Sequence, residues 1–468
     1  MARCQGAFSS PETFARGRRH LLSHLVCFGR HTVTGLLRSQ DRTQSDWTAD
    51  YRLYSEDRFD EDRIFGQVRS EIEQLGGGAD APLVVAMDDS LLRKTGPKIP
   101  GSRYQRDPLS PPFHVNFVRG LRVLQISAAV PQGSEGAARL IPVDFQHAAL
   151  AARPRRNAPP EVHAAYEQER AKRNINVIGR DRLIHLRQQM DRDGSARRPL
   201  VVTIDGRFTN ATVLRGIPDR TTLVGRVRKD CALHFVPDLQ PERGRKRKYG
   251  QRCPTPLELL KDPSHPWQAV QAYAAGQRYE FRVKTLGPVL SPMDKGARVW
   301  RVVVVEPVSY RKSKNSKLER RQPAFLLCSN PDLPLEELLQ VYLWRWDIEV
   351  NFRDEKTILG VGQAQVRTEA SNQNAPALGV AAYALLLLAA IQVYGEEGRP
   401  AAMNNPQWYR RKAKERLTTN ALISQLRYEL WASSLQGHFQ PFSSSNGSNQ
   451  NAQKCDVPLS SALFNTIK

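Results

Sequence analysis

The sequence is poor in the residues that build thiol or imidazole metal sites. Its 468 residues contain six cysteines, none in a C-x-x-C pair, which excludes a zinc ribbon and gives no disulfide framework. Ten histidines are present, but they form no H-E-x-x-H motif or other paired-ligand spacing. Any catalytic metal should therefore be a hard cation on oxygen ligands. The scattered cysteines also fit a reducing cytoplasm.

Long apolar runs are missing as well. The one segment that could suggest a membrane span, residues 377–391, is shorter than the roughly 20 apolar residues that a span needs. Much of this segment is alanine. We therefore expect a buried core helix there and no membrane partner.

Acidic residues are too few to balance the basic ones. Lys and Arg total 69 against 47 Asp and Glu, so the formal net charge is +22. Such an excess favours a polyanionic partner, above all nucleic acid, because each neutralised phosphate releases counterions. The alternative, a generally basic soluble protein, fits a charge of this size less well.

The chain is long enough for two or more domains and a large core. Residues 12–75 are predicted to be helical, with arginines interleaved among the apolar positions. This N-terminal region, residues 1–78, could be a small DNA-binding region or a helical cap on a catalytic domain. A Gly-rich run at 76–82 is typical of a linker.

Two apolar strand patterns each end in an acid, L-V-V-A-M-D at residues 83–88 and L-V-V-T-I-D at residues 200–205. A long helix is predicted between them, at about 160–190. Further strands are predicted at 121–130, 140–145 and 222–228. The mixture predicts an α/β fold, and we assign its first part to residues 79–230.

Residues 231–328 differ in composition from the preceding part, with proline-rich breaks and strand-like runs. Two basic runs, 243–249 and 311–321, lie within this segment. Basic runs are often only solvated, but two of them in an already basic protein favour contact with DNA. The segment is therefore predicted to be a mostly β, basic insertion.

The core is expected to resume at residues 329–395. Beyond it, residues 396–468 should hold a basic amphipathic helix and a disordered tail. The helix is predicted at 408–435, and the tail at 443–453.

The most informative segment follows the insertion. Residues 334–359 are predicted to form one helix, because Asp332 and Pro334 stand near its start and no Gly or Pro follows until Gly360. At 3.6 residues per turn, one stripe about 80° wide then carries a tyrosine, a carboxylate and three cations. These residues are Tyr342, Arg345, Glu349, Arg353 and Lys356.

Helical geometry alone leaves the role of this stripe open. It could be a solvated face with i,i+4 ion pairs, Arg345 to Glu349 and Glu349 to Arg353. It would equally suit a backbone phosphate held beside a metal ion. The other acids of the segment are expected to point away from the stripe; they are Asp347, Asp354 and Glu355.

The spacing of the stripe distinguishes these interpretations. Tyr, two residues, Arg, three residues, Glu, six residues, Lys resembles the signature of the DDE transposases of bacterial insertion sequences, specifically insertion sequence family four, which are DDE superfamily endonucleases. The resemblance implies that Glu349 is the third metal-binding carboxylate. It also implies that Tyr342, Arg345 and Lys356 hold DNA phosphates, and Arg353 is a further candidate.

The same resemblance covers the two strand-ending acids. An Asp after a strand is often only a turn residue or a helix N-cap. However, the block that begins at Asp88 looks like the family's first-Asp block, although Ser90 stands where Thr is commoner. The block that begins at Asp205 looks like the second. Asp88 is preferred to Asp89 because the family places its metal ligand first, and successive strand residues face opposite ways.

The resemblance spans roughly residues 80–395 and implies an RNase H-like core interrupted by a β insertion. It implies that Asp88, Asp205 and Glu349 bind two Mg²⁺ or Mn²⁺ ions, which are catalytic in phosphoryl transfer. The expected activity is that of a transposase that cuts DNA at the element's terminal repeats and joins the freed 3′-hydroxyl to target DNA. The partners would be double-stranded DNA and a second copy of the chain, in the nucleoid of a bacterial cytoplasm.

Two other functions stay open at this stage. A catalytically silent, domesticated DNA-binding regulator should have lost a carboxylate, whereas all three are present. A stand-alone metal-dependent endonuclease would cleave without strand transfer. The family also stacks a flipped base on an aromatic residue of its insertion; Trp267 and Trp300 are candidates, but each could simply belong to the core.

Overall fold

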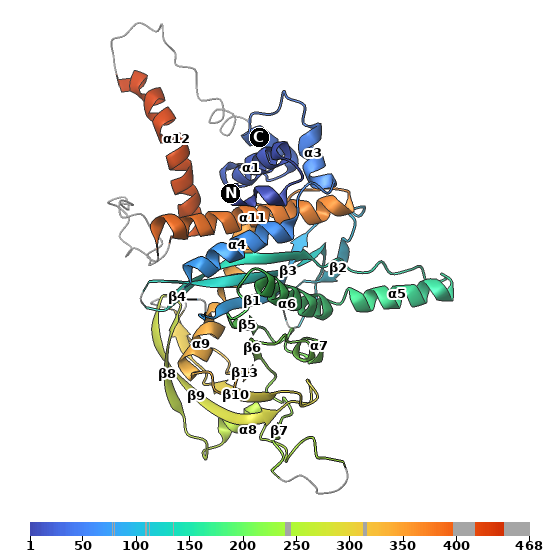
Figure 1. The fold of residues 1–468 in the computed structure, drawn as a ribbon, viewed down its shortest axis with the longest axis vertical. Helices are drawn as coiled ribbons and strands as arrows, with labels where there is room; N and C mark the ends of the chain where they lie inside the picture. The colour runs from blue at the N-terminus through green and yellow to red at the C-terminus, as the bar shows by residue number, and fades with distance from the viewer. Residues whose placement is uncertain are drawn as a thin grey trace.

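The computed structural model describes residues 1–76, 78, 80–107, 110–111, 113–133, 135–238, 245–311, 316–395 and 417–443. Within this part of the chain, one large mixed sheet of 11 strands runs through the molecule and helices pack against it (Figure 1). The α/β class expected from the sequence is confirmed.

The first half of the sheet is built from the strands that the apolar patterns predicted. Its order is β4-β3-β1-β5-β6. Strands β1, β3 and β4 pair antiparallel, and β5 and β6 run parallel to β1. Their bounds are β1 (Leu83–Arg93), β3 (Phe117–Gln132), β4 (Ala137–His147), β5 (Leu200–Ile204) and β6 (Thr221–Arg226). A short strand, β2 (Arg103–Arg106), pairs with the start of β3.

The β-rich segment continues this sheet. Strand β13 (Ala324–Cys328) pairs with β6, β10 (Val299–Val305) pairs with β13, and β9 (Gln277–Leu290) pairs with β10. The remaining elements are β7 (His234–Phe235), α8 (Pro256–Lys261), β8 (Gln268–Ala274) and the hairpin of β11 (Ser309–Arg311) with β12 (Leu318–Arg320). Residues 243–244 and 312–315 of the two basic runs lie outside the described residues.

The N-terminal region packs onto the sheet as a cap. Its elements are η1 (Ala2–Ala7), α1 (Pro11–Val26), α2 (Val33–Ser39), α3 (Thr48–Ser55) and α4 (Glu61–Leu75). Buried side chains of α4, such as Ile64 and Val68, belong to the same hydrophobic core as Val85 and Met87 of β1. This packing agrees with the second of the two roles left open for these helices, and any contact with DNA stays a prediction.

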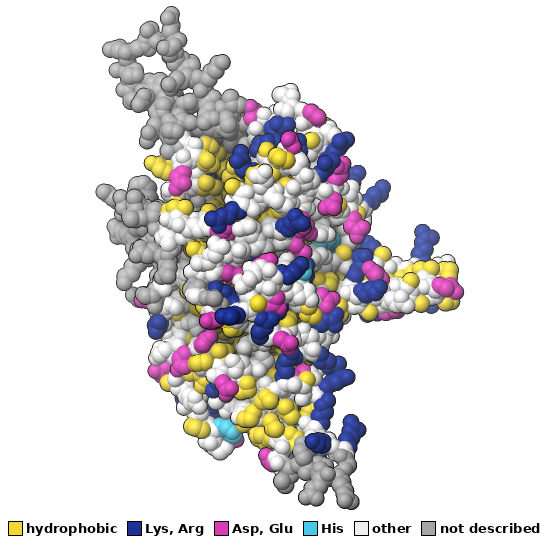
Figure 2. Space-filling view, viewed as in Figure 1, with side chains coloured by type: hydrophobic (Ala, Val, Ile, Leu, Met, Phe, Trp, Pro, Cys, Tyr) yellow, Lys and Arg dark blue, Asp and Glu magenta, His cyan; other side chains and the backbone are white. Residues whose placement is uncertain are grey.

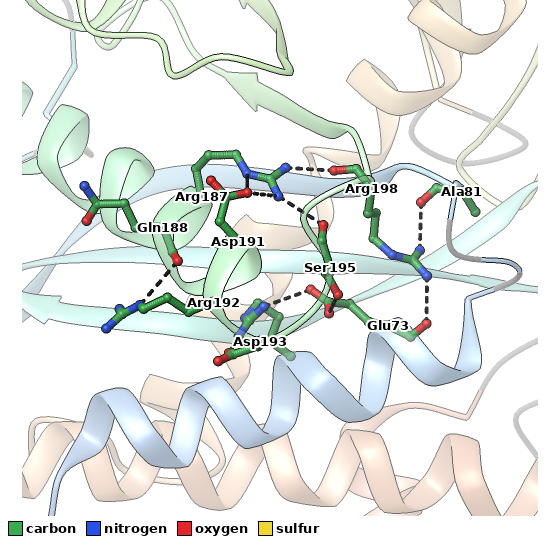
Figure 3. A network of polar contacts seen from close by, with 10 residues as sticks. Glu73, Ala81, Arg187, Gln188, Asp191, Arg192, Asp193, Ser195 and Arg198 are labelled. Carbon is green, nitrogen blue, oxygen red and sulfur yellow. Dashed lines mark hydrogen bonds and ion pairs between the residues drawn. The ribbon is translucent and has the colours of Figure 1, made fainter.

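The Gly-rich run after α4 is tied to the sheet rather than spanning between separate bodies. The buried Arg198 donates to the backbone carbonyls of Glu73 at 3.0 Å and Ala81 at 2.7 Å (Figure 3). It also donates to the carbonyls of Gly76 and Gly78. Residues 77 and 79 lie outside the described part of the run.

The long helix expected at 160–190 is two helices. Helix α5 (Pro160–Lys172) ends at Arg173, and α6 (Ile175–Arg192) begins after Asn174, whose side chain accepts from the backbone of Asn176 at its N-terminus. Helix α5 buries none of its residues and projects from the body (Figure 1). A short helix, α7 (Ala211–Arg215), follows β5.

Helix α11 (Glu369–Tyr394) contains the apolar segment 377–391 and is a core helix, as expected. By length and composition it could cross a membrane, but 78% of its most apolar window is buried inside the protein. Helix α12 (Thr419–Ser443) overlaps the predicted C-terminal helix, whose residues 408–416 lie outside the described chain, as do residues 444–453 of the predicted tail.

Candidate active site

The two strand-ending aspartates lie side by side at the carboxyl ends of adjacent parallel strands. The ladder between β1 and β5 ends at the pair Met87 and Ile204, so Asp88 and Asp205 are the next residues on their strands. By alternation, both share the sheet face of Ala86. That face packs against α9 (Leu335–Trp344) and α10 (Asp347–Thr357).

Asp88 is held in a position that disfavours its charge. Its Oδ1 accepts a hydrogen bond of 2.8 Å from the backbone N–H of Asp89, and Arg345 donates to its Oδ2 at 3.3 Å. Burial, followed by the nearby charge of Asp205, raises the pKa of Asp88 to about 7. Two carboxylates forced together in this way favour a cation between them.

The neighbouring acid, Asp89, points to the other face of the sheet. It forms ion pairs with Arg122 at 2.9 Å and Arg207 at 3.3 Å, and its side chain is 8% exposed. Asp89 is thus already neutralised by two arginines on the opposite face, whereas Asp88 faces Asp205. This arrangement agrees with the preference for Asp88.

Asp205 is both a turn residue and a member of the acid pair. Its Oδ1 accepts from the backbone N–H groups of Arg207 at 2.9 Å and Phe208 at 3.2 Å. Such a turn fixes the carboxylate at the strand end. Asp205 is therefore a turn residue, which was the alternative that the sequence left open, and the turn holds its carboxylate beside Asp88.

The predicted single helix at 334–359 is divided in two. Between α9 and α10, the N–H groups of Arg345 and Trp346 bond to carbonyls three residues earlier, as in a 3₁₀ turn. Glu349 lies in the first turn of α10. Its Oε1 accepts from Arg345 at 3.4 Å, so one guanidinium links the carboxylate of Glu349 to that of Asp88.

The donor set suits a hard cation, but the three acids do not form a closed metal cluster. In the part of the chain that is described, no three His, Cys, Asp or Glu side chains are grouped closely enough to hold an ion. At this site Arg345 lies between Asp88 and Glu349. One guanidinium thus links Asp88 to Glu349, while Asp205 stands beside Asp88 at the next strand end.

Two of the residues predicted to bind phosphate, Tyr342 and Lys356, lie close to Arg345 and Asp88 or their neighbours, whereas Arg353 does not. The ring of Tyr342 is 5.8 Å from the guanidinium of Arg345, and Lys356 donates to the hydroxyl of Ser90, two residues after Asp88 on the same face. Burial lowers the pKa of Lys356. Arg353, by contrast, is 65% exposed and pairs with Asp354 at 2.9 Å, so it does not join the others at the acids.

The acids expected to point away from the stripe anchor α10 to its surroundings. Asp347 accepts from the backbone N–H of Leu140, and Asp354 accepts from Thr419. Glu355 is fully buried against Gln125 of β3, at 3.0 Å, and burial raises its pKa to about 8.

The sequence interpretation missed a cation at the same strand ends. Ile204 pairs with Gly225, so Arg226, the next residue on β6, follows Asp88 and Asp205 across the three parallel strands. By alternation it lies on the face of α9, and its charge acts on Tyr342. The signal was available, because a strand was predicted at 222–228.

Neither Trp267 nor Trp300 is an exposed stacking surface. Trp300 is fully buried and its indole N–H donates to Asp294 at 2.9 Å, so its core role is confirmed. Trp267 is half-buried, with the charged groups of Arg282 and Lys284 at 5.3 and 4.7 Å from its ring.

Comparison with known protein families gives a match to the DDE superfamily endonuclease model over residues 6–287. This is more than half of the chain, and the protein belongs to that family. The matched region includes Asp88 and Asp205 and ends before Glu349. It also includes the N-terminal helices, which the sequence interpretation had left outside its resemblance. No curated protein matches the chain.

Proposed function

We propose that this protein is a DNA transposase of an insertion sequence, which cleaves phosphodiesters at the element's ends and joins the 3′-hydroxyl to target DNA. The observation that carries the proposal is the pairing of Asp88 and Asp205 at adjacent parallel strand ends, with Glu349 linked to Asp88 through Arg345. Membership of the DDE superfamily endonuclease family supports a nuclease or transposase.

The strand order supports an RNase H-like core. Three antiparallel strands followed by two parallel ones, in the order β4-β3-β1-β5-β6, would place the first acid on the central strand and the second on its parallel neighbour. The third acid would come from a helix on one face. Strands β7 to β10 and β13 would then form the family's insertion, added to the sheet beyond β6.

In this proposal Asp88, Asp205 and Glu349 hold two Mg²⁺ or Mn²⁺ ions, which, when bound, would polarise the scissile phosphate and activate the attacking hydroxyl. Arg345 would bind the phosphate and give up its carboxylate contacts. The hydroxyl of Tyr342 and the ammonium of Lys356 would fix the strand on either side, because they lie before and after Glu349 along α9 and α10. Arg353 would contact DNA farther from the acids.

The charge of the chain supports DNA as the substrate. Lys and Arg exceed Asp and Glu by 22, and Lys and Arg side chains gather along the edge of the molecule from which α5 projects (Figure 2). Neutralised phosphates would release counterions and drive binding. We further propose a homodimer on paired ends, because two ends must be joined, acting at the bacterial nucleoid.

The test uses the purified full chain and a plasmid that carries the two genomic flanks of its coding region. With Mg²⁺, nicks or double-strand breaks should map to the element boundaries. Glu349→Gln should abolish them while leaving DNA binding intact. Glu336→Gln, an exposed acid of α9, is the matched control and should cut like the wild type.

Each other outcome selects a different function. A folded wild type that binds the flanks but leaves them uncut in Mg²⁺ and in Mn²⁺ would indicate a DNA-binding regulator. Cleavage without transfer of the 3′-ends to a second plasmid would indicate a stand-alone endonuclease. Cleavage that persists in Glu349→Gln would remove Glu349 from the site.

A further inference from the structure

A short two-stranded ribbon at the start of β3 carries alternating aromatic and basic side chains. Strand β2 pairs antiparallel with the start of β3, and Tyr104 lies opposite Arg119. In the same register, Arg106 lies opposite Phe117. Directly opposed residues, and residues two apart on one strand, share a face. One face of the ribbon therefore carries two aromatic rings and two guanidinium groups in alternation. We call this surface the ribbon face; it consists of Tyr104, Arg106, Phe117 and Arg119.

The aromatic rings of the ribbon face are open to solvent. Tyr104 is 67% exposed and Phe117 is 65% exposed, and Phe113 in the connecting loop is 91% exposed. The guanidinium of Arg119 lies 4.8 Å from the centre of the Tyr104 ring and also donates to the carbonyl of Ser102. Large aromatic residues held in the open at this density mark a binding surface.

The opposite side of the ribbon is fixed to the catalytic strand. Gln105 donates to the carbonyl of Gly120 at 3.2 Å and accepts from Arg122 at 2.8 Å. Arg122 in turn donates to Asp89, the residue after Asp88, at 2.9 Å. The ribbon face is thus presented on a rigid support that is continuous with the site.

The ribbon face and the pair of Asp88 and Asp205 lie on the same face of the sheet. Gln125 of β3 lies opposite Asp88, and alternation along β3 places Phe117 and Arg119 on the face of Gln125. Arg119 is six residues from Gln125 and Phe117 is eight, which at about 3.3 Å per residue is roughly 20 and 26 Å. A DNA segment held at Asp88 would reach the ribbon face within one turn of duplex, about 34 Å.

We propose that the ribbon face binds unpaired bases of the DNA engaged at the catalytic acids, with Tyr104 and Phe117 stacking on bases and Arg106 and Arg119 contacting phosphates. This inference rests on the proposed function and adds a single-strand binding site to it. Aromatic faces stack on any unstacked base, and interleaved arginines neutralise the backbone. A protein partner is disfavoured, because each ring has an arginine opposite it and the apolar surface is not contiguous.

The test measures binding of a fluorescent 20-nucleotide single strand and of a blunt duplex to the full chain without divalent ions. The variant Tyr104→Ala/Phe117→Ala should lose about tenfold or more in single-strand affinity and less than twofold in blunt-duplex affinity. Tyr104→Phe/Phe117→Tyr keeps both rings and should bind like the wild type. Tyr428→Ala removes a ring of similar exposure, 63%, on α12 and should change neither affinity.

The outcomes separate this inference from the proposed function. If the wild type binds single strands through the ribbon face but never cuts the element flanks, the binding site stands and the transposase proposal fails. Equal losses for both probes, or no loss in the alanine variant, would overturn the inference. So would loss of self-association by that variant in sedimentation with its DNA affinity unchanged, because the surface would then be a protein interface.

Discussion

Arg345 donates from Nη1 to Oδ2 of Asp88 across 3.3 Å, and thereby connects the turn between α9 and α10 to strand β1. The same guanidinium reaches Glu349 through Nη2. A single cation thus balances acids that come from distant parts of the chain. Because a divalent ion on these acids would compete with it, Arg345 links the proposed metal and phosphate sites.

Arg345→Gln should therefore separate metal binding from catalysis. Removing the cation leaves the acids without their internal counter-charge, so Mn²⁺ affinity should rise severalfold in calorimetry. Cleavage of the element flanks should fall by roughly 100-fold, because a charged phosphate contact is lost. Weaker Mn²⁺ binding in a folded Arg345→Gln protein would contradict this prediction.

Asp88→Asn should stabilise the metal-free protein, and more so as the pH rises. The pKa of Asp88 is raised from 3.8 to about 7 in the folded protein, so the protonated form favours folding and this stabilisation is lost as the pH rises through about 7. In chelator, the free energy of unfolding of Asp88→Asn should exceed that of the wild type by an amount that grows between pH 4 and pH 7. Above pH 7 this difference should stay constant. The gain at pH 8 should be roughly 1–4 kcal/mol.

Urea unfolding at a series of pH values measures this gain. Asp57→Asn, an exposed acid in a turn, supplies the baseline. Added Mg²⁺ should stabilise the wild type at pH 8 and leave Asp88→Asn almost unchanged, because the variant lacks a ligand. An advantage of Asp88→Asn that shrinks with rising pH would contradict the prediction.

The acid pair was predictable because its signal is local. Two apolar strand patterns end in Asp88 and Asp205, and parallel strands bring their carboxyl ends to one edge. Alternation predicted that only one of Asp88 and Asp89 would face the site, and the family resemblance chose Asp88. The pairing of β13 with β6 could not be predicted in this way, because strand partners more than ninety residues apart are chosen by tertiary packing.

The division of the helix predicted at 334–359 could not be predicted from the sequence either, because no Gly or Pro marks it. The turn at Arg345 and Trp346 is accompanied by non-local contacts, among them a hydrogen bond of 2.8 Å from the Trp344 indole to the carbonyl of Gly136. Around this turn four backbone N–H groups each bond to a carbonyl three residues earlier, so the second helix does not continue the phase of the first; they belong to Arg345, Trp346, Ile348 and Glu349. Arg353, which a continuous helix would place on the stripe, is exposed and pairs with Asp354.

Arg226→Ala should weaken DNA binding through the loss of one phosphate contact. Arg226 stands beside Asp205 at the strand ends, where a bound strand would pass. Its removal should lower the affinity for the element flanks and reduce the slope of log affinity against log salt by about 1. Fluorescence anisotropy between 50 and 300 mM KCl, roughly the range in which such slopes are resolved, measures both. Arg192→Ala on α6, which removes one exposed bond to a carbonyl of its own helix, is the matched control, and equal slopes for both variants would contradict the assignment.

Arg198→Ala should loosen the N-terminal cap from the sheet. Arg198 is 5% exposed and donates to four backbone carbonyls at the end of α4 and in the run that follows it, two of which appear in Figure 3. Without it these carbonyls lose their charged donor, and the free energy of unfolding should fall by roughly 3 kcal/mol. Hydrogen exchange should rise first in residues 73–83, before the strands.

Arg192→Ala, which removes one exposed bond to a carbonyl of its own helix, is the control. If Arg198→Ala melts like Arg192→Ala, the run after α4 is a free linker, and the cap is held by its apolar contacts alone.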